Sequence, residues 1–284
     1  MTTNATTTAV FDLATRDRFA ALYPETAGAL DHSLSQDARF RLDALADLAE
    51  RIGPKKVEYN AADLPIGVRA EDVGPTGRSI GDTIREIERA GSWAVLKNVE
   101  ADPVYARLLS DLLSELAAVI DGTTGRILRP QAYIFISSPG AITPFHFDPE
   151  HNILMQLRGS KDMHTFPAGD PAFAADREHE RYHRGGHRNL PWNDALMAGA
   201  TVTRLTPGKA VYVPVMAPHF VRNGPESSVS LSITWRSEWS MAEANARAFN
   251  GWLRDHGLSP KATQRFPNSN TAKAFAGRVL RKFG

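Results

Sequence analysis

Apolar residues in the first part of the chain recur mostly at helical spacing. In residues 102–120 they recur every three or four positions, which is typical of the buried face of an amphipathic helix. The same spacing predicts helices over residues 11–22, 36–52 and 79–90, and short strands are expected at residues 57–59 and 92–98. We therefore expect residues 1–125 to form a mainly helical N-terminal region with a few strands that pack on the core.

The pattern changes to short alternating segments near residue 126. Val229, Leu231 and Ile233 alternate with small hydroxylated residues, which predicts a strand with one apolar and one polar face over residues 229–235. Further strands are expected at residues 127–138, 145–148, 152–158, 161–166, 202–205, 210–215 and 220–223. Many short strands separated by Pro and Gly indicate a sandwich or barrel. Helical spacing returns over residues 241–256, with Ser240 as the expected N-cap.

The polar face of residues 229–235 suggests a binding cavity. Ser230, Ser232 and Thr234 are small, so inside a barrel they would leave room for a ligand and offer it hydrogen bonds. A barrel filled for structural reasons alone would carry bulky apolar residues at these positions. The alternative interpretation is an ordinary strand with one face in water.

Gly159 and Ser160 separate two of the predicted strands and indicate a two-residue hairpin turn. In such a hairpin Arg158 and Lys161 are cross-strand neighbours on one face. Side chains alternate along a strand, so the same face also carries Asn152. A cation and an amide would then face one cavity, as a carboxylate-bearing ligand requires.

His146 and Asp148 lie one residue apart in residues 143–150. Because side chains alternate between faces in an extended segment, these two point the same way. His219 ends the apolar run of residues 211–219 and offers a third ligand. Two histidines and one carboxylate form the facial triad of non-haem Fe(II) oxygenases, which leaves positions open for a cosubstrate and dioxygen. The alternative is a chance His-x-Asp pair, since the chain has nine histidines.

The chain resembles the JmjC-type, cupin-like Fe(II)/2-oxoglutarate oxygenases in the order of Thr143, His146, Asp148, Asn152, Lys161, His219 and Thr234. Within them it is most similar to the branch that contains the asparaginyl hydroxylase of hypoxia-inducible factor. In that branch a lysine fifteen residues after the first histidine binds the distal carboxylate of 2-oxoglutarate, and Lys161 stands fifteen residues after His146. The stretch before the distal histidine is matched by Gly208, Tyr212 and Pro214. The resemblance covers about residues 130–236.

The resemblance implies an α+β fold whose core, residues 126–236, is a double-stranded β-helix of the jelly-roll or cupin type. An insert at residues 167–200 and a C-terminal helical extension at residues 237–284 complete the expected organisation. The implied metal ligands for Fe(II) are His146, Asp148 and His219, and the implied contacts to 2-oxoglutarate are Lys161, Thr143, Asn152, Thr234 and Tyr133. Thr234 stands where the relative has asparagine. The implied reaction uses O2 and 2-oxoglutarate, forms succinate and hydroxylates a substrate.

Two other classes of function share these metal ligands. A non-oxygenase cupin, such as an isomerase or a small-molecule-binding module, would use them for another divalent metal and would not need a carboxylate anchor at Lys161. A regulatory module with an inactive site is the other alternative. For an oxygenase, we expect a peptide, protein or amino-acid-like substrate, and a small molecule is also open.

The insert at residues 167–200 is long for a connection within a compact domain, and such loops are often functional. We interpret it as a lid or substrate-recognition loop, with Tyr182, Arg188 and Trp192 as expected substrate contacts. His179, His183 and His187 are spaced by four and also suggest a second metal site. However, Gly185 and Gly186 interrupt any helix between the last two histidines, so a solvated loop is the simpler interpretation.

The composition excludes several other classes. The chain has 284 residues and a formal net charge of +1, which argues against a dedicated nucleic-acid-binding protein. It has no cysteine, so disulfides and thiolate ligands are excluded. Residues 1–10 lack the pattern of a signal peptide, and no apolar run is long enough to span a membrane, so we expect a cytoplasmic protein.

The C-terminal extension is expected to have one of two roles. Its apolar positions Ala244, Ala248, Phe249 and Trp252 would cover one end of the barrel or pair with a second subunit in a homodimer. Lys and Arg outnumber Asp and Glu from residue 236 onward, which would attract an acidic partner or RNA. A solvated surface is the simpler interpretation of that charge.

Overall fold

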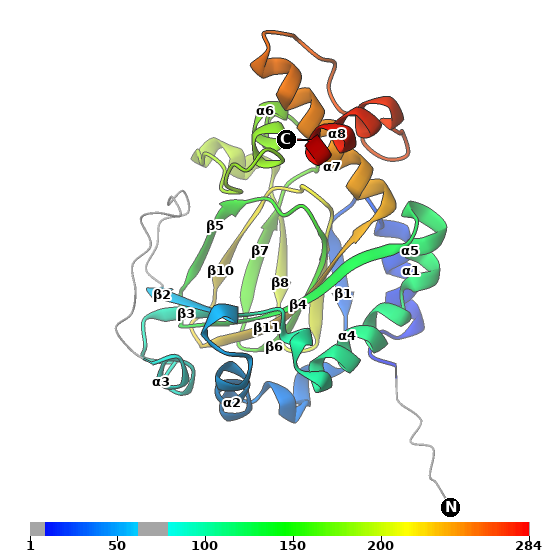
Figure 1. Ribbon diagram of the computed structural model, residues 1–284. Coiled ribbons are helices and arrows are strands. Elements are labelled where there is room, and N and C mark those ends of the chain that lie inside the picture. Colours follow the sequence, from blue (N-terminus) through cyan, green and yellow to red (C-terminus); the bar gives the residue numbers. More distant parts are fainter. Residues whose placement is uncertain (1–8, 62–78, 284) are drawn as a thin grey trace, which may run out of the picture.

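A computed structural model describes residues 9–61 and 79–283 (Figure 1). Two antiparallel sheets face each other, one of seven strands in the order β1-β9-β6-β11-β4-β3-β2 and one of four strands in the order β5-β10-β7-β8. The strands are β1 (Gly28–Asp31), β2 (Val57–Ala61), β3 (Ser92–Lys97), β4 (Ile127–Ser137), β5 (Ile142–His146), β6 (His151–Arg158), β7 (Lys161–Thr165), β8 (Thr201–Leu205), β9 (Lys209–Val213), β10 (His219–Asn223) and β11 (Ser228–Ser237). This arrangement confirms the predicted α+β fold with a jelly-roll core.

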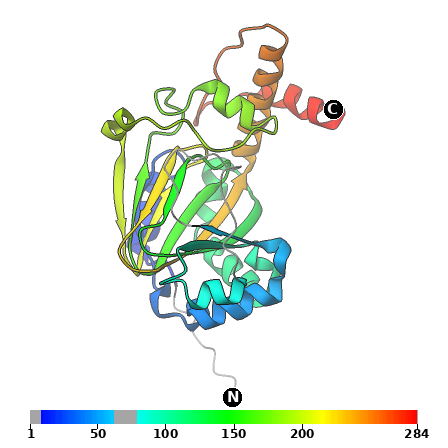
Figure 2. The same ribbon diagram turned by 90° about the vertical axis from the view of Figure 1, so that its left-hand side faces the viewer.

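Helices cover the outer side of the seven-stranded sheet and one end of the barrel (Figures 1 and 2). The helices are α1 (Leu13–Leu22), α2 (Leu42–Ile52), α3 (Ile80–Arg85), α4 (Pro103–Ser114), α5 (Ala117–Thr124), α6 (Asp176–Tyr182), α7 (Glu238–Asp255) and α8 (Thr271–Phe283). Short 3-10 turns lie at Leu34–Gln36, Ala38–Phe40, Pro54–Lys56, Val99–Ala101 and Asp194–Gly199. None of the helices in the described residues is long and apolar enough to cross a membrane.

The alternation in β11 separates the main core from the inner side of the barrel, between the two sheets. Val229, Leu231 and Ile233 are buried against the N-terminal helices in the largest apolar cluster of the protein. The alternate residues Ser230 and Ser232 face the other way and donate hydrogen bonds to amide side chains of β6. The predicted apolar and hydroxylic faces of this strand are therefore confirmed. The hydroxylic face is buried and not exposed to solvent.

The predicted hairpin at Gly159 and Ser160 is wrong. β6 lies in the seven-stranded sheet between β9 and β11, whereas β7 lies in the four-stranded sheet between β10 and β8. Arg158 pairs with Val229, and Lys161 pairs with Leu205 and Asn223, so the two are not cross-strand neighbours. The turn signal marked the reversal correctly, but it carries no information on whether the flanking strands pair or change sheets.

Two helix predictions also need correction, and one helix was not predicted. The helix expected at residues 102–120 is divided into α4 and α5, because the Glu115 carboxylate accepts hydrogen bonds from the backbone of Val10 and Phe11 while Leu116 is buried. Such tertiary contacts override local helical spacing. α7 begins at Glu238, because Ser237 and Ser240 form a capping box there. The sequence did not reveal α8, which packs along α7.

Residues 1–8 lie outside the described residues. They are part of the N-terminal segment that was expected to lack a signal peptide. α7 and α8 contact each other within one chain, and α7 also contacts α6 of the insert. The C-terminal extension therefore covers one end of the barrel (Figure 1). This is one of the two roles expected for it. The homodimer stays a prediction.

Candidate metal and cosubstrate site

His146, Asp148 and His219 come together at one end of the barrel. His146 is the last residue of β5 and His219 is the first residue of β10, and the two are direct partners in the ladder. Asp148 follows two residues after β5 and places Oδ2 3.6 Å from Nε2 of each histidine. Potential ligand atoms of all three lie within 4.8 Å of one another. In the described part of the chain, no other group of three or more His, Cys, Asp or Glu residues does so.

Backbone carbonyls orient both histidines. Nδ1 of His146 donates to Pro144 O at 2.7 Å, and Nδ1 of His219 donates to Ala217 O at 2.9 Å. Each bond fixes the tautomer in which Nε2 carries the lone pair, and Nε2 is the atom that faces Asp148. Burial, together with His146 nearby, lowers the pKa of His219 to about 3, so this ring is neutral as a metal ligand must be.

Asp148 is the anionic member of the group. Burial opposes its ionisation, but the Arg188 guanidinium outweighs this effect and holds the pKa of Asp148 well below its usual range. Nη1 of Arg188 lies 2.7 Å from Oδ1, which leaves Oδ2 directed toward the histidines. Two neutral imidazole nitrogens and one carboxylate oxygen are the donor set of a facial Fe(II) site, so these residues fit that metal.

The insert holds Arg188 in place through its backbone. Arg188 O accepts a hydrogen bond from Phe147 N at 3.3 Å, and Leu190 N donates to Phe145 O at 2.9 Å. Residues 188–190 of the insert thus run beside β5 as a short extension of the sheet. Arg188, which the sequence predicted as a substrate contact, is by this geometry a partner of the metal ligand Asp148.

Lys161 is a buried cation on the inner face of the four-stranded sheet. Its side chain is 4% exposed, and burial lowers the pKa of Lys161 to about 7. Among the described residues, no carboxylate forms an ion pair with it. Thr165 pairs with His219 in the β7–β10 ladder, and Lys161 lies four residues before Thr165, so Lys161 and His219 share one face.

The other predicted cosubstrate contacts lie on two surfaces. Asn152 and Thr234 are direct partners in the β6–β11 ladder, and Asn152 accepts a hydrogen bond from Ser232 at 2.8 Å. Tyr133 is the partner of Ser232 across β4 and β11, so it shares the same inner face. Thr143 differs from these three, because it is exposed on β5 and pairs with Val221.

Two further insert residues, Tyr182 and Trp192, occupy different environments. The Tyr182 ring meets the Phe147 ring edge-on, 5.5 Å away, beside the metal group. Trp192 packs against Phe145 and Phe220, on the side of the four-stranded sheet that faces away from the two histidine ligands. The structure therefore brings Tyr182 to the candidate site and does not bring Trp192 there.

The three histidines of the insert do not form a metal site in the structure. His179 is buried and its ring stacks on Phe147 at 4.9 Å. α6 ends at Tyr182, so His187 is not on a common helical face with the other two. The interpretation without a second metal is therefore the one that the geometry supports.

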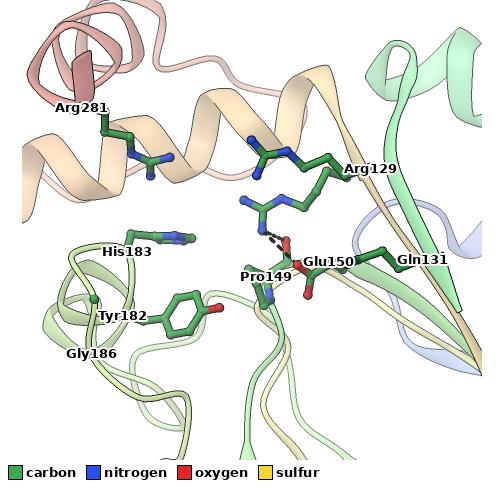
Figure 3. Close-up of a pocket in the computed structure, with 10 residues that line it drawn as sticks. Arg129, Gln131, Pro149, Glu150, Tyr182, His183, Gly186 and Arg281 are labelled. Carbon is green, nitrogen blue, oxygen red and sulfur yellow. Dashed lines mark hydrogen bonds and ion pairs between the residues drawn. The ribbon is translucent and has the colours of Figure 1, made fainter. Parts of the chain in front are cut away.

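Sequence reasoning missed a cavity of about 440 Å³ next to the metal group. Its walls include Pro149 and Glu150, which directly follow Asp148, and three arginines, Arg129, Arg236 and Arg281 (Figure 3). The lining residues come from β4, β11, the insert and α8. No local spacing could have revealed them, because residues so far apart in the chain meet only in the folded protein.

Comparisons with known structures bear out the fold. The chain is similar to the Escherichia coli ribosomal oxygenase YcfD, with a TM-score of 0.52 and 15% sequence identity over 94% of this chain and 66% of that one. The complex of the same protein with cobalt and 2-oxoglutarate gives a TM-score of 0.50 and 16% identity, over 94% of this chain and 65% of that one. The chain thus spans about two thirds of the length of the E. coli protein. No protein-family model and no curated protein matches the chain.

The predicted resemblance to JmjC-type, cupin-like oxygenases is thereby confirmed at the level of the fold. These comparisons do not specify the branch of the asparaginyl hydroxylase. At such low sequence identity the function has to be argued from the site itself.

Proposed function

We propose that the protein is an Fe(II)/2-oxoglutarate-dependent oxygenase that hydroxylates its substrate. The observation that carries this proposal is the position of Lys161 relative to the metal group. Lys161 is a buried cation without a carboxylate partner among the described residues, and it shares a face with His219. Four residues along a strand correspond to about 13 Å. The lysine side chain and a five-carbon dicarboxylate together span that distance.

In this proposal His146, Asp148 and His219 hold Fe(II), which when bound supplies the redox chemistry toward O2, 2-oxoglutarate and a C–H bond of the substrate. Lys161 donates charge-assisted hydrogen bonds to the far carboxylate of 2-oxoglutarate and fixes its orientation. Asn152, Thr234 and Tyr133 offer further polar contacts from the opposite sheet. Arg188 keeps the Asp148 carboxylate ionised and oriented. Thr143 remains a proposed contact that depends on the cosubstrate reaching the outer edge of β5.

Residues on the inner face also limit the access of water. The interior between the sheets beside Lys161 is apolar, with Leu154, Met163 and Val211 buried in one cluster. A dicarboxylate in this interior replaces solvent around the lysine, so the ion pair forms at low dielectric and is strong. The chain thereby supplies binding and orientation, while the oxidising power comes from the cofactors.

A non-oxygenase cupin is the competing function. Such a protein needs the three metal ligands but has no use for a buried cation on the same face. Leaving Lys161 buried without an anionic partner is unfavourable for stability, because burial penalises the charged form. A carboxylate-bearing cosubstrate explains this residue, whereas metal binding alone does not.

We further propose that the substrate enters past the insert, where Tyr182 lies beside the ligand segment. The name of the E. coli protein refers to a ribosomal oxygenase, which makes a protein substrate worth testing for this chain. A peptide or a small molecule is equally compatible with the metal and cosubstrate residues.

The test is succinate formation from 2-oxoglutarate in air by protein reconstituted with Fe(II) under anaerobic conditions. We expect slow turnover by the wild type, none by His146→Ala, and a much higher requirement for 2-oxoglutarate by Lys161→Ala. The matched controls are His256→Ala and Lys55→Met, both at exposed positions, and they should behave like the wild type. Metal binding by the wild type without binding of 2-oxoglutarate would contradict the proposal and favour the non-oxygenase cupin.

A further inference from the structure

The cavity next to the metal group is strongly basic. Arg129, Arg236 and Arg281 line it, and Glu150 is the acidic side chain among the lining residues. Glu150 lies 3.7 Å from Arg236, which also donates to Pro149 O. Among the described residues, no carboxylate forms an ion pair with Arg129 or Arg281. Figure 3 shows the guanidinium ends of Arg129 and Arg281 directed into the same space above Tyr182 and Glu150.

Arg236 provides a second and independent observation, an unpaired buried donor. Its side chain is 9% exposed, and its Nε is buried without a hydrogen-bond partner in the structure. Buried polar atoms are normally paired, so the hydrogen bonds of this cavity-lining guanidinium are incompletely satisfied within the protein. Burial lowers the pKa of Arg236, and Arg129 and Arg281 lower it further although Glu150 opposes them, so like charges repel across this space.

We propose that this cavity is the substrate pocket and that it takes a small organic acid, through a carboxylate or phosphate group held by Arg129, Arg236 and Arg281. The inference rests on the proposed oxygenase function and names the substrate class for it. Arginine forks match the oxygens of both anionic groups. Pro149 and Glu150, which directly follow Asp148 in the chain, also line the cavity, so a small molecule bound there would lie next to the metal group.

The size and walls of the cavity favour a small molecule over a polypeptide. A volume of about 440 Å³ lies within the range typical of small-molecule sites. The insert closes one side through Tyr182 and His183, and α8 closes another through Arg281 (Figure 3). The insert and α8 therefore share a role, because both contribute to the wall of this cavity.

The anion site can be tested without iron or cosubstrate. Thermal denaturation of the full chain is followed at increasing inorganic phosphate and constant ionic strength, because a ligand of the folded state raises the midpoint. We expect a saturable rise for the wild type and also for Lys161→Met, which removes the other anion-binding cation. In the double variant Arg129→Gln/Arg281→Gln the apparent affinity should fall by about tenfold or more. Arg107→Gln, an exposed arginine on α4, is the matched control and should respond like the wild type.

A double variant that responds to phosphate like the wild type would overturn the anion site. Both substituted arginines are exposed, and circular dichroism of the variant checks its fold. If the variant does not fold, the single charge reversal Arg281→Glu replaces it, with the same expected loss of the phosphate response.

The substrate class is tested by stimulation of 2-oxoglutarate turnover with carboxylic acids, phosphate monoesters, neutral analogues and peptides. We expect an acid to stimulate 2-oxoglutarate turnover. Whether a carboxylic acid or a phosphate monoester stimulates it more strongly identifies the anionic group that the cavity binds. The double variant should then need at least about tenfold more of that acid for half-maximal stimulation. Stimulation by neutral compounds or by polypeptides alone would overturn the small-acid assignment. Complete lack of turnover with a normal phosphate response would instead contradict the oxygenase function and leave the anion site standing.

Discussion

His146 and His219 are direct partners across the β5–β10 ladder, and their ring centroids lie 4.2 Å apart. Residues opposite each other in antiparallel strands project from the same face, so the sheet itself sets the separation of the two rings. The register shifts between His219 and Val221, which places an irregularity directly after the ligand. Irregularities of this kind re-aim a side chain next to a functional site. The ligand pair is therefore a property of the strand register and not of a flexible loop.

Asp148→Asn should abolish specific binding of a divalent metal. The substitution retains the shape of the side chain but removes the anionic oxygen that lies 3.6 Å from both histidines. Changes to residues that only support metal ligands already cost about 10- to 100-fold in affinity, so loss of a ligand should cost more. Titration with Co(II), followed by its visible absorption, measures this effect. Wild-type affinity in Asp148→Asn would show that the metal binds elsewhere.

Arg188→Gln should weaken metal binding without abolishing it. Arg188 binds Oδ1 of Asp148 at 2.7 Å and leaves Oδ2 for the metal, so its role is to position the ligand. We expect a loss of about 10- to 100-fold in Co(II) affinity, with an unchanged absorption spectrum at saturation. Arg188→Lys should recover part of the affinity, because it restores the charge but not the planar fork. A spectrum that differs from that of the wild type would mean that Arg188→Gln changes the ligand set.

Two parts of the candidate site follow from a local rule, the alternation of side chains along a strand. Alternation in an extended segment placed His146 and Asp148 on one side, and alternation in residues 229–235 identified the polar inner face that Ser232 and Thr234 share. Burial of Lys161 agrees with its predicted role, although the hairpin invoked to place it does not exist. Lys161 lies on the inner face of the other sheet, where Thr165 aligns it with His219.

Features that depend on tertiary contacts could not be predicted in this way. The division between α4 and α5 depends on Glu115, whose carboxylate binds backbone groups more than a hundred residues away. The basic cavity joins arginines from β4, β11 and α8, which have no pattern in common. Arg188 has a clear role only once its distance to Asp148 is known.

Lys161→Met should stabilise the protein when metal and cosubstrate are absent. The folded protein has a pKa of about 7 for Lys161, against a usual value of 10.5, because the charged form is buried. Between these values the unfolded chain binds more protons, so the contribution of Lys161 to stability rises as the pH increases from about 7 to 10.5. The gain from Lys161→Met should therefore be greatest at and below pH 7, on the order of a few kcal/mol, and should shrink at higher pH.

Urea denaturation of the wild type and of Lys161→Met at neutral and alkaline pH checks this prediction. Lys55→Met is the matched control, because Lys55 is exposed and its replacement should change stability little at either pH. Equal stability of Lys161→Met and wild type at neutral pH would mean that another group of the protein neutralises the charge of Lys161.

Gly159→Ala should be strongly destabilising at the corner where the chain passes from one sheet to the other. Gly159 has a φ of +64°, and a Cβ at this position would lie 2.2 Å from the carbonyl oxygen of Ser227. Both backbone strain and a clash with backbone therefore oppose any side chain. Gly53→Ala is the matched control, since Gly53 has a φ of +79° but no atom within 4 Å of the added Cβ. Strain alone should cost about 1–2 kcal/mol there, and urea denaturation should show a clearly larger loss at Gly159. Equal losses would exclude the clash.

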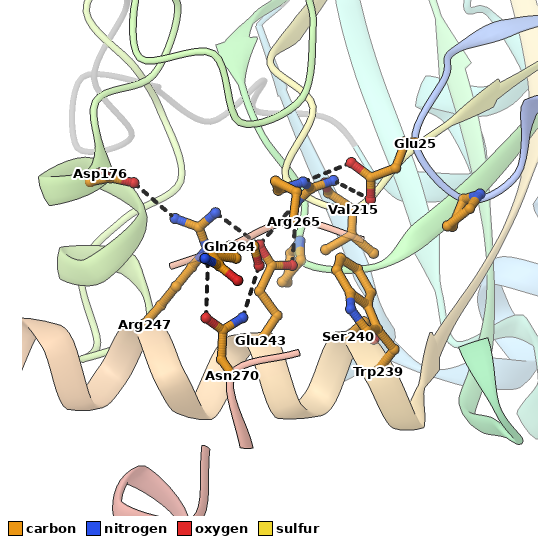
Figure 4. Close-up of polar contacts among 12 residues, drawn as sticks. Glu25, Asp176, Val215, Trp239, Ser240, Glu243, Arg247, Gln264, Arg265 and Asn270 are labelled. Carbon is orange, nitrogen blue, oxygen red and sulfur yellow. Dashed lines mark hydrogen bonds and ion pairs between the residues drawn. The ribbon is translucent and has the colours of Figure 1, made fainter. Parts of the chain in front are cut away.

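Arg265 should be essential for attaching the C-terminal extension to the barrel. Its guanidinium binds Glu25 at 2.9 Å and Glu243 at 3.0 Å, and it donates to the carbonyl of Val215, which lies just before the loop that leads to His219 (Figure 4). Arg265→Met leaves the buried carboxylate of Glu243 and the half-buried carboxylate of Glu25 with fewer partners, so the loss of stability should be about 3–5 kcal/mol. The exposed pair of Arg18 and Asp31 provides the matched control, because Arg18→Gln should cost less than about 1 kcal/mol. Since the same guanidinium holds the segment before His219, Arg265→Met should also lower Co(II) affinity. Loss of stability with unchanged Co(II) affinity would show that the network supports the extension but not the metal site.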